Sequence, residues 1–141
     1  MTCDFCEIAN GRASAGIVHQ TADIMAFADT FPIRPGHIQI IPKAHIEVFE
    51  DLPPRLASGI LHLGQRIARV QKRIYGAARV GFVFSGHDVA HAHAHLIPLH
   101  DRTDLTSLRY YALGSNLPLR ELEITPADAA RTAEPICEAM A

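Results

Sequence analysis

The chain has 141 residues, of which 48% are hydrophobic and 20% are charged, and its formal net charge is −2. This length predicts one domain over residues 1–141 that buries most of its apolar surface. The charge balance excludes the strongly basic surface typical of proteins that bind nucleic acid or an anionic membrane, so neither partner is expected. A small phosphorylated ligand remains compatible, because it needs only a local site.

The cellular compartment follows from hydropathy and cysteine count. No apolar run approaches the ~20 residues that cross a bilayer, and no signal pattern is present, so a cytoplasmic location is expected. Three cysteines are an odd number, which argues against a disulfide framework. Cys3 and Cys6 form a C-x-x-C pair that suits a metal, whereas Cys137 is expected to be a small buried hydrophobe.

Short apolar runs alternate with turn residues in the first third of the chain. A helical turn is expected to end at Gly11. Strands are then expected at residues 17–20, 24–28 and 37–41, with a turn at 21–23 and a proline-containing loop at 29–36.

A long helix is predicted over residues 53–75. Its apolar residues recur at steps of three and four and form one stripe, made of Leu56, Ile60, Leu63, Ile67, Val70 and Ile74. Strands over 80–84 and 91–99 follow, and a last helix over 126–140. Short connections between these elements predict an α+β fold: an antiparallel sheet of about five strands with one long helix packed on a face, plus a C-terminal helix.

The most unusual segment reads His-Ala-His-Ala-His at residues 91–95, and alternation at period two is typical of a strand. Neighbouring imidazoles on one face of a strand stand about 6.6 Å apart, and the outer two about 13 Å. Three rings so spaced can hardly share one zinc ion, because Zn–N bonds are only about 2.0–2.1 Å long. The three histidines are therefore expected to have different roles, each as a metal ligand, a base or a nucleophile.

The run His-φ-His-φ-His-φ-φ, where φ is apolar, resembles the signature of the histidine triad (HIT) nucleotide hydrolases and transferases. Further segments at 3–11, 26–29, 35–45 and 86–98 match this family in order and spacing. The resemblance therefore covers a core of about residues 1–102, and residues 103–141 form a C-terminal extension without such support.

The resemblance implies that His93 attacks the α-phosphorus of a nucleotide and forms a nucleotidyl-histidine, which water or a phosphate acceptor then resolves. His95 would contact the phosphoryl oxygens and help to protonate the leaving group. His37 matches a fourth active-site histidine of the family, although a histidine at a strand start can also be satisfied by backbone.

The resemblance also implies a nucleotide pocket. Asp29 matches an acid that accepts hydrogen bonds from ribose hydroxyls, whereas by itself it suits a turn. Apolar Ile8, Phe27 and Ile38 are candidates for the base pocket, and each could equally belong to the core.

A zinc site is the further implication, through Cys3, Cys6, His45 and the first triad residue, His91. Two cysteines and two histidines are a common structural zinc set. Four protein ligands leave no open position, so the ion is expected to be structural. The alternative is a reduced C-x-x-C with His45 at the surface.

The chain departs from the family just before the triad, where Gly86-His87-Asp88 replaces the frequent Gly-Gln-(Ser or Thr). The Asp88 carboxylate would repel a phosphate unless it is turned away or paired. Phosphate donors are therefore expected from His87, from the backbone N–H groups up to Val89 and from the His95 ring. Ser85 stands in for an asparagine of the family.

These observations favour a hydrolase that cleaves a purine nucleotide derivative at its α-phosphorus. Candidate substrates are a nucleoside phosphoramidate, an acyl-adenylate and a dinucleoside polyphosphate. The alternatives are a nucleotidyltransferase or phosphorylase with phosphate as acceptor, and a non-catalytic nucleotide-binding or scaffold protein. The family implies a homodimer around the long helix and the sheet edge.

Overall fold

The computed structural model describes residues 3–86, 88–101, 104–105 and 124–141. Five strands form one antiparallel sheet in the order β1-β2-β3-β5-β4. They are β1 (Gly16–Gln20), β2 (Ile24–Ala28), β3 (Ile38–Pro42), β4 (Arg79–Ser85) and β5 (His93–Leu99). The helices are α1 (Asp4–Ala9), α2 (Pro54–Tyr75) and α4 (Pro126–Met140), with a 3-10 turn η1 (Phe49–Asp51). This architecture confirms the predicted α+β class.

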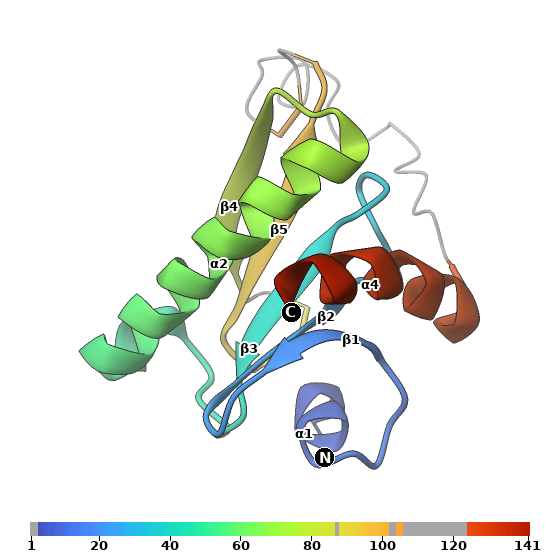
Figure 1. The fold of residues 1–141 in the computed structure, drawn as a ribbon. Coiled ribbons are helices and arrows are strands. Elements are labelled where there is room, and N and C mark those ends of the chain that lie inside the picture. The colour runs from blue at the N-terminus through green and yellow to red at the C-terminus, as the bar shows by residue number, and fades with distance from the viewer. Residues whose placement is uncertain (1–2, 87, 102–103, 106–123) are drawn as a thin grey trace, which may run out of the picture.

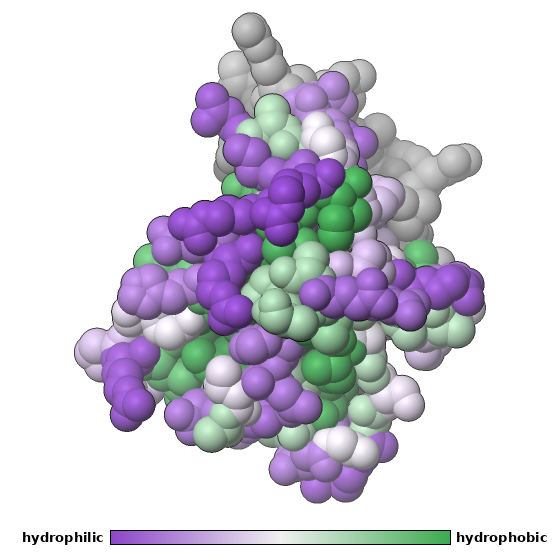
Figure 2. All heavy atoms as spheres, viewed as in Figure 1, coloured by the Kyte–Doolittle hydropathy of each residue, from purple (hydrophilic) through white to green (hydrophobic). Residues whose placement is uncertain are grey.

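Helices α2 and α4 cover the same face of the sheet (Figure 1). The main core lies between them and the strands, because strand side chains alternate between the two faces. Its fully buried members include Ile38 and Ile40 of β3, Ile60 and Ile67 of α2, and Ile136 of α4. Hydrophilic residues cover much of the outer surface of these helices (Figure 2).

The opposite face of the sheet carries a second, smaller apolar cluster. It consists of Phe5 from α1 with Met25, Phe27 and Ile41 from the sheet. Because Gln39 lies opposite both Phe27 and His95 in the ladders, all three side chains point to this face. The chemistry expected of the histidines therefore lies on the face that α2 and α4 leave free.

The long helix follows the predicted limits closely. It starts at Pro54 and ends at Gly76, which adopts the left-handed conformation (φ +62°) typical of a helix C-terminus. The predicted apolar stripe holds except in the last turn, where Ile74 is 40% exposed. A polar residue that was not expected in the core, Gln71, is fully buried instead.

The C-terminal helix belongs to the main core rather than to a separate unit. It begins with a capping box, in which Thr125 and Asp128 bond each other's backbone N–H groups. Its axis passes over β1 so closely that a Cβ atom at Gly16 would lie 2.5 Å from the Ala129 carbonyl oxygen. This close approach is what the glycine permits.

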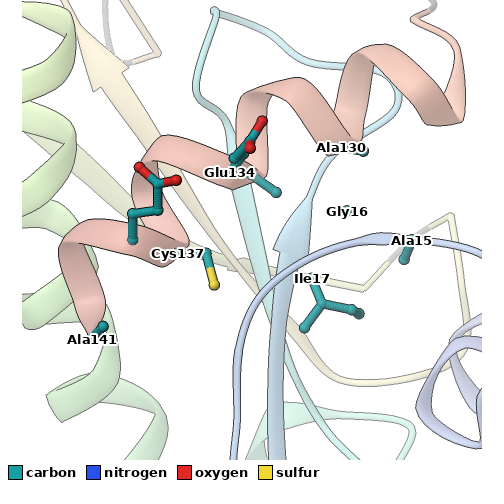
Figure 3. A pocket seen from close by; sticks show the side chains of 9 residues that line it. Ala15, Gly16, Ile17, Ala130, Glu134, Cys137 and Ala141 are labelled. Carbon is teal, nitrogen blue, oxygen red and sulfur yellow. The ribbon is translucent and has the colours of Figure 1, made fainter.

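A shallow hollow remains between α4 and β1, lined mostly by small and apolar side chains (Figure 3). Cys137 faces it and is exposed, so the expectation of a buried Cys137 was wrong. The residue sits on the side of α4 that β1 does not cover completely. Among the described residues, no helix combines the length and the apolar character needed to cross a membrane.

Candidate active site and metal centre

The central residue of the triad, His93, is the first residue of β5 and is buried. Its Nδ1 lies 2.6 Å from the carbonyl oxygen of His91. A carbonyl only accepts, so Nδ1 carries the proton and Nε2 keeps a lone pair. The edge of the Phe5 ring packs against the imidazole, with ring centroids 5.1 Å apart. In the neutral form of the ring, the hydrogen bond to His91 thus leaves Nε2 with its lone pair.

A chain of hydrogen bonds fixes the protons of two further histidines. The Ile33 N–H donates to Nδ1 of His37 at 3.1 Å, so the proton of that ring is on Nε2. Nε2 of His37 then donates to Nδ1 of His95 at 2.8 Å. Nε2 of His95 in turn donates to the Ser85 hydroxyl at 2.7 Å. We refer to this series as the histidine relay.

Burial keeps both rings of the relay neutral. Desolvation lowers the pKa of His37 to about 4, against the opposing effect of the Asp29 carboxylate. Desolvation also lowers the pKa of His95, with a further lowering by His93, while Asp29 and Asp88 act in the opposite direction. A neutral ring donates one hydrogen bond and accepts one, as the relay requires.

Asp29 is buried beside the relay. Its Oδ1 accepts from the Phe31 N–H at 2.7 Å, and its Oδ2 accepts from Nε2 of Gln39 at 2.6 Å. The same Oδ2 lies 3.4 Å from Nε2 of His37 and 3.9 Å from Nδ1 of His95. Sequence reasoning missed Gln39, although its position two residues after His37 on a strand places it on the same face.

The apolar candidates for the base pocket divide between the two faces of the sheet. Ile8 and Phe27 belong to the cluster around Phe5, on the histidine face, and Val89, expected as a phosphate donor through its N–H, packs against the same cluster. Ile38 is fully buried in the main core instead. Of the two alternatives left open for Ile38, base pocket or core, the structure selects the core, because its strand position points it toward α2.

The strand that carries the triad is shorter than the expected 91–99. His91 lies in a bend and its N–H donates to the Val89 carbonyl at 2.7 Å, so β5 starts at His93 and not at residue 91. Asp88 is exposed. His87 lies outside the described residues.

The candidate metal centre brings together four side chains from distant parts of the chain. One ligand atom from each of Cys3, Cys6, His45 and His91 lies within 4.8 Å of the others. The Nδ1 of His91 is 3.4 Å from the Cys3 sulfur and 3.6 Å from the Cys6 sulfur, and Nδ1 of His45 is 3.3 Å from the Cys6 sulfur. A tetrahedral zinc ion with ordinary bond lengths separates such atoms by about 3.6 Å.

A second contact orients the buried ring of this centre. Nε2 of His91 donates to the Pro42 carbonyl at 2.9 Å, which leaves Nδ1 unprotonated and facing the two sulfurs. Burial lowers the pKa of His91, so the neutral form that a metal requires is favoured. The donor set and its spacing therefore fit a metal ion.

Asp29, His37 and His95 also bring three ligand atoms within 4.8 Å of one another. The 2.8 Å between the two imidazole nitrogens is a hydrogen-bond length, shorter than the roughly 3.3 Å expected for two nitrogens on one zinc ion. This group suits a proton relay better than a metal.

The comparisons with known proteins agree with this geometry. The HIT domain family matches residues 10–102. The chain belongs to the HIT family. An uncharacterized HIT-like protein of Methanocaldococcus jannaschii is 29% identical over 103 residues, which cover 70% of this chain and 80% of that protein. The adenosine 5'-monophosphoramidase of Saccharomyces cerevisiae is 30% identical over 100 residues, with 70% of this chain and 63% of the enzyme covered.

Solved structures of HIT proteins share the whole fold. A zinc-bound histidine triad family protein of Mycobacterium smegmatis superposes with a TM-score of 0.75 and 25% identity over 99% of this chain and 94% of that one. A HIT-like protein of Bartonella henselae gives a TM-score of 0.79 at 22% identity, with 98% and 96% of the two chains covered. The second likeness bears on the fold alone. Because the matches extend beyond residue 102, α4 is part of the shared architecture.

Proposed function

We propose that this HIT protein hydrolyses a purine nucleotide derivative at its α-phosphorus through a covalent intermediate on His93. The observation that carries the proposal is the placement of protons: Nε2 of His93 has a free lone pair, and the neighbouring His95 presents an N–H. The two imidazole centroids are 4.9 Å apart, so one phosphoryl group can meet both rings.

In the proposed reaction, a bond forms between Nε2 of His93 and phosphorus while the bond to the leaving group breaks. Nε2–H of His95 exchanges its bond to Ser85 for one to a phosphoryl oxygen, and the leaving atom takes up a proton from solvent water as it departs. Water then attacks phosphorus and releases a proton to solvent, the bond between phosphorus and Nε2 of His93 breaks, and the nucleoside monophosphate leaves. Asp29 binds the ribose in this scheme, and Ile8, Phe27 and Val89 contact the base.

We further propose that Cys3, Cys6, His45 and His91 bind one structural zinc ion. The spacing of the four ligand atoms and the fixed tautomer of His91 support this assignment. The ion would fasten the start of α1 to the segment that precedes β5. With four protein ligands no position is left for water, so the zinc takes no part in the proposed hydrolysis.

A nucleoside phosphoramidate is the first substrate to test, since the relative from Saccharomyces cerevisiae is named as an adenosine 5'-monophosphoramidase. The protein is incubated with adenosine phosphoramidate and acid-quenched, and the adenylyl adduct and AMP are measured by mass spectrometry. Adduct or turnover is expected in the wild type and absent in His93→Ala. The matched control is His62→Ala, which removes an exposed histidine of α2.

The same experiment separates the alternatives. ADP formation in the presence of inorganic phosphate would identify a phosphorylase. Nucleotide binding without adduct or turnover would favour a binding or scaffold protein, and turnover that survives in His93→Ala would reject the nucleophile.

Metal analysis tests the zinc assignment separately. Protein purified without chelators should hold about one zinc per chain, as expected for a four-ligand structural site. Cys3→Ser should lower that content, whereas Cys137→Ser, at an exposed thiol far along the chain, should not.

A homodimer is also part of the proposal. It is supported by the exposed edge strand β4, whose Val83 is 40% exposed, and by the neighbouring exposed Phe49. An unpaired, partly apolar edge is a surface that a second copy can cover.

A further inference from the structure

One polar side chain interrupts the apolar inner face of α2. Gln71 is fully buried, and its Nε2 donates to the Gly36 carbonyl at 2.7 Å and to the Leu96 carbonyl at 3.0 Å. Its Oε1 is buried and has no hydrogen-bond partner among the described residues. A buried amide oxygen without a hydrogen bond lowers the stability of the fold. The favourable contribution of Gln71 therefore comes from the two hydrogen bonds that its Nε2 donates.

The two carbonyls bonded by Gln71 adjoin the histidine relay. Gly36 directly precedes His37, and Leu96 directly follows His95. The ladder between β3 and β5 starts only at the pair Ile38–Leu96 and contains three pairs. Continued by two residues, the same register would place a proline, Pro98, opposite Gly36, and proline has no N–H to donate. Gln71 supplies donors where the ladder ends.

The last turns of α2 also pack directly against the backbone before His37. Gly36 has a positive φ of +86°, and a Cβ atom there would lie 2.2 Å from the ring of Tyr75. Tyr75 follows Gln71 by one helical turn, so both side chains contact the same glycine. Side chains of α2 therefore fix the position of Gly36, and with it the start of β3, relative to β5.

We propose that Gln71 is a positioning residue that holds His37 and His95 at hydrogen-bond distance. This inference rests on the proposed function, because the pair affects catalysis only if His95 acts on the substrate. A small displacement of either strand would lengthen the 2.8 Å bond between the rings. The N–H of His37 would then be free to turn to Oδ2 of Asp29, 3.4 Å away, and His95 would lose the contact that selects its tautomer.

The test replaces Gln71 with methionine, which has a similar volume and no donor. Gln71→Met should remain folded, while kcat for adenosine phosphoramidate falls about tenfold and KM changes less than about threefold. In the free protein, the ¹⁵N resonances of the His95 ring should no longer report a single Nε2–H tautomer, whereas His37 should keep its Nε2–H because the Ile33 N–H still donates to Nδ1. A helix–sheet contact that only stabilises the fold would leave these resonances unchanged.

Val70→Ala is the matched control, since Val70 is buried at the adjacent position of α2 and cannot hydrogen-bond. It should lower the melting temperature without altering kcat or the ring resonances. The proposal is overturned if Gln71→Met keeps wild-type kcat and resonances, or if Val70→Ala changes them equally.

The proposal can still be tested if Gln71→Met fails to fold or if the wild type shows no turnover. If Gln71→Met does not fold, Gln71→Asn gives the same comparison, because its shorter amide cannot reach both carbonyls. If the wild type itself shows no turnover, the proposed function fails, and the tautomer of His95 in Gln71→Met still decides the role of Gln71.

Discussion

The rings of His91, His93 and His95 donate to three different acceptors, and this difference supports the separate roles proposed for them. His91 donates from Nε2 to Pro42 and turns Nδ1 toward the cysteines. His93 donates from Nδ1 to the His91 carbonyl and keeps Nε2 free. Identical residues two positions apart thus adopt opposite tautomers, one suited to a metal and one to phosphorus.

The buried ring of His37 predicts that stability depends on pH. Its folded pKa of about 4 lies below the value of about 6.5 in an unfolded chain. Between these values the unfolded state binds a proton that the folded state excludes, so the free energy of unfolding falls as pH drops from about 6.5 to about 4. Asp29 and His95 face this ring and act on its pKa in opposite directions.

Urea unfolding at pH 7.5, 5.5 and 4.5 measures this dependence. The buried His95, whose pKa is also lowered, contributes to the same slope. Replacement of His37 by glutamine should therefore reduce the slope without abolishing it. An identical slope in His37→Gln would contradict the assignment.

At the scale of elements, we expect α1 to depend on the proposed metal centre. A helix of six residues is not stable by itself, and α1 is held by Cys3 and Cys6 at its start and by the packing of Phe5. Removal of zinc from loaded protein should therefore release α1 while the sheet stays folded. Such release would also move Phe5 away from the His93 ring.

Hydrogen exchange with and without a chelator tests this dependence. The amides of Glu7 and Asn10, which donate to the Cys3 and Cys6 carbonyls, should exchange at least about tenfold faster without zinc. Amides of β3 should be unaffected and provide the internal control. Equal exchange at Glu7 and Asn10 in both states would show that the metal does not hold α1.

The close packing of α4 on β1 predicts that a larger residue at position 16 destabilises the protein. Gly16→Ala places a methyl group 2.5 Å from the Ala129 carbonyl oxygen, so the helix must shift. A loss of about 1–3 kcal/mol in the free energy of unfolding is expected from such overpacking. Gly86→Ala is the control, because its added Cβ would lie 3.9 Å from the nearest atom found, the Glu47 oxygen. Equal losses in the two variants would refute the steric explanation.

At the scale of the whole molecule, the main hydrophobic core and the candidate site lie on opposite faces of the sheet. One face buries the main core under α2 and α4, and the other carries the relay and the metal centre. Gln71 is an exception, because it acts from the helix side on backbone that supports the histidine side. Among the described residues, β4 pairs only with β5, and its other edge is the surface proposed for self-association.

If the homodimer forms through the edge of β4, a charged residue on that edge should disrupt it. Val83→Lys should shift the protein from dimer to monomer in sedimentation velocity at micromolar concentration, because burying an unpaired ammonium group is costly. Ala127→Lys, at an exposed position of α4, should leave the assembly unchanged. A wild type that sediments as a monomer would reject the dimer itself.

Much of the architecture was predictable because periodicity is a local property of the chain. Steps of three and four predicted α2 nearly to the residue, and short apolar runs predicted the strands. Two details of the strands differ from these expectations or were left open by them. Strand β5 begins after His91, because that residue's N–H bonds to Val89 in a bend, and Ile38 points to the core, since only the sheet's two layers determine which face is free.

The sequence by itself determined the elements, the family and the identity of the histidines and cysteines, because these depend on residue type and spacing. Only the tertiary structure decided where the protons lie and which residues support the site. His91 meets the two cysteines across more than 80 positions, and Gln71 meets Gly36 across 35. A tautomer is set by an acceptor that a distant segment supplies, and local spacing carries no information about that segment.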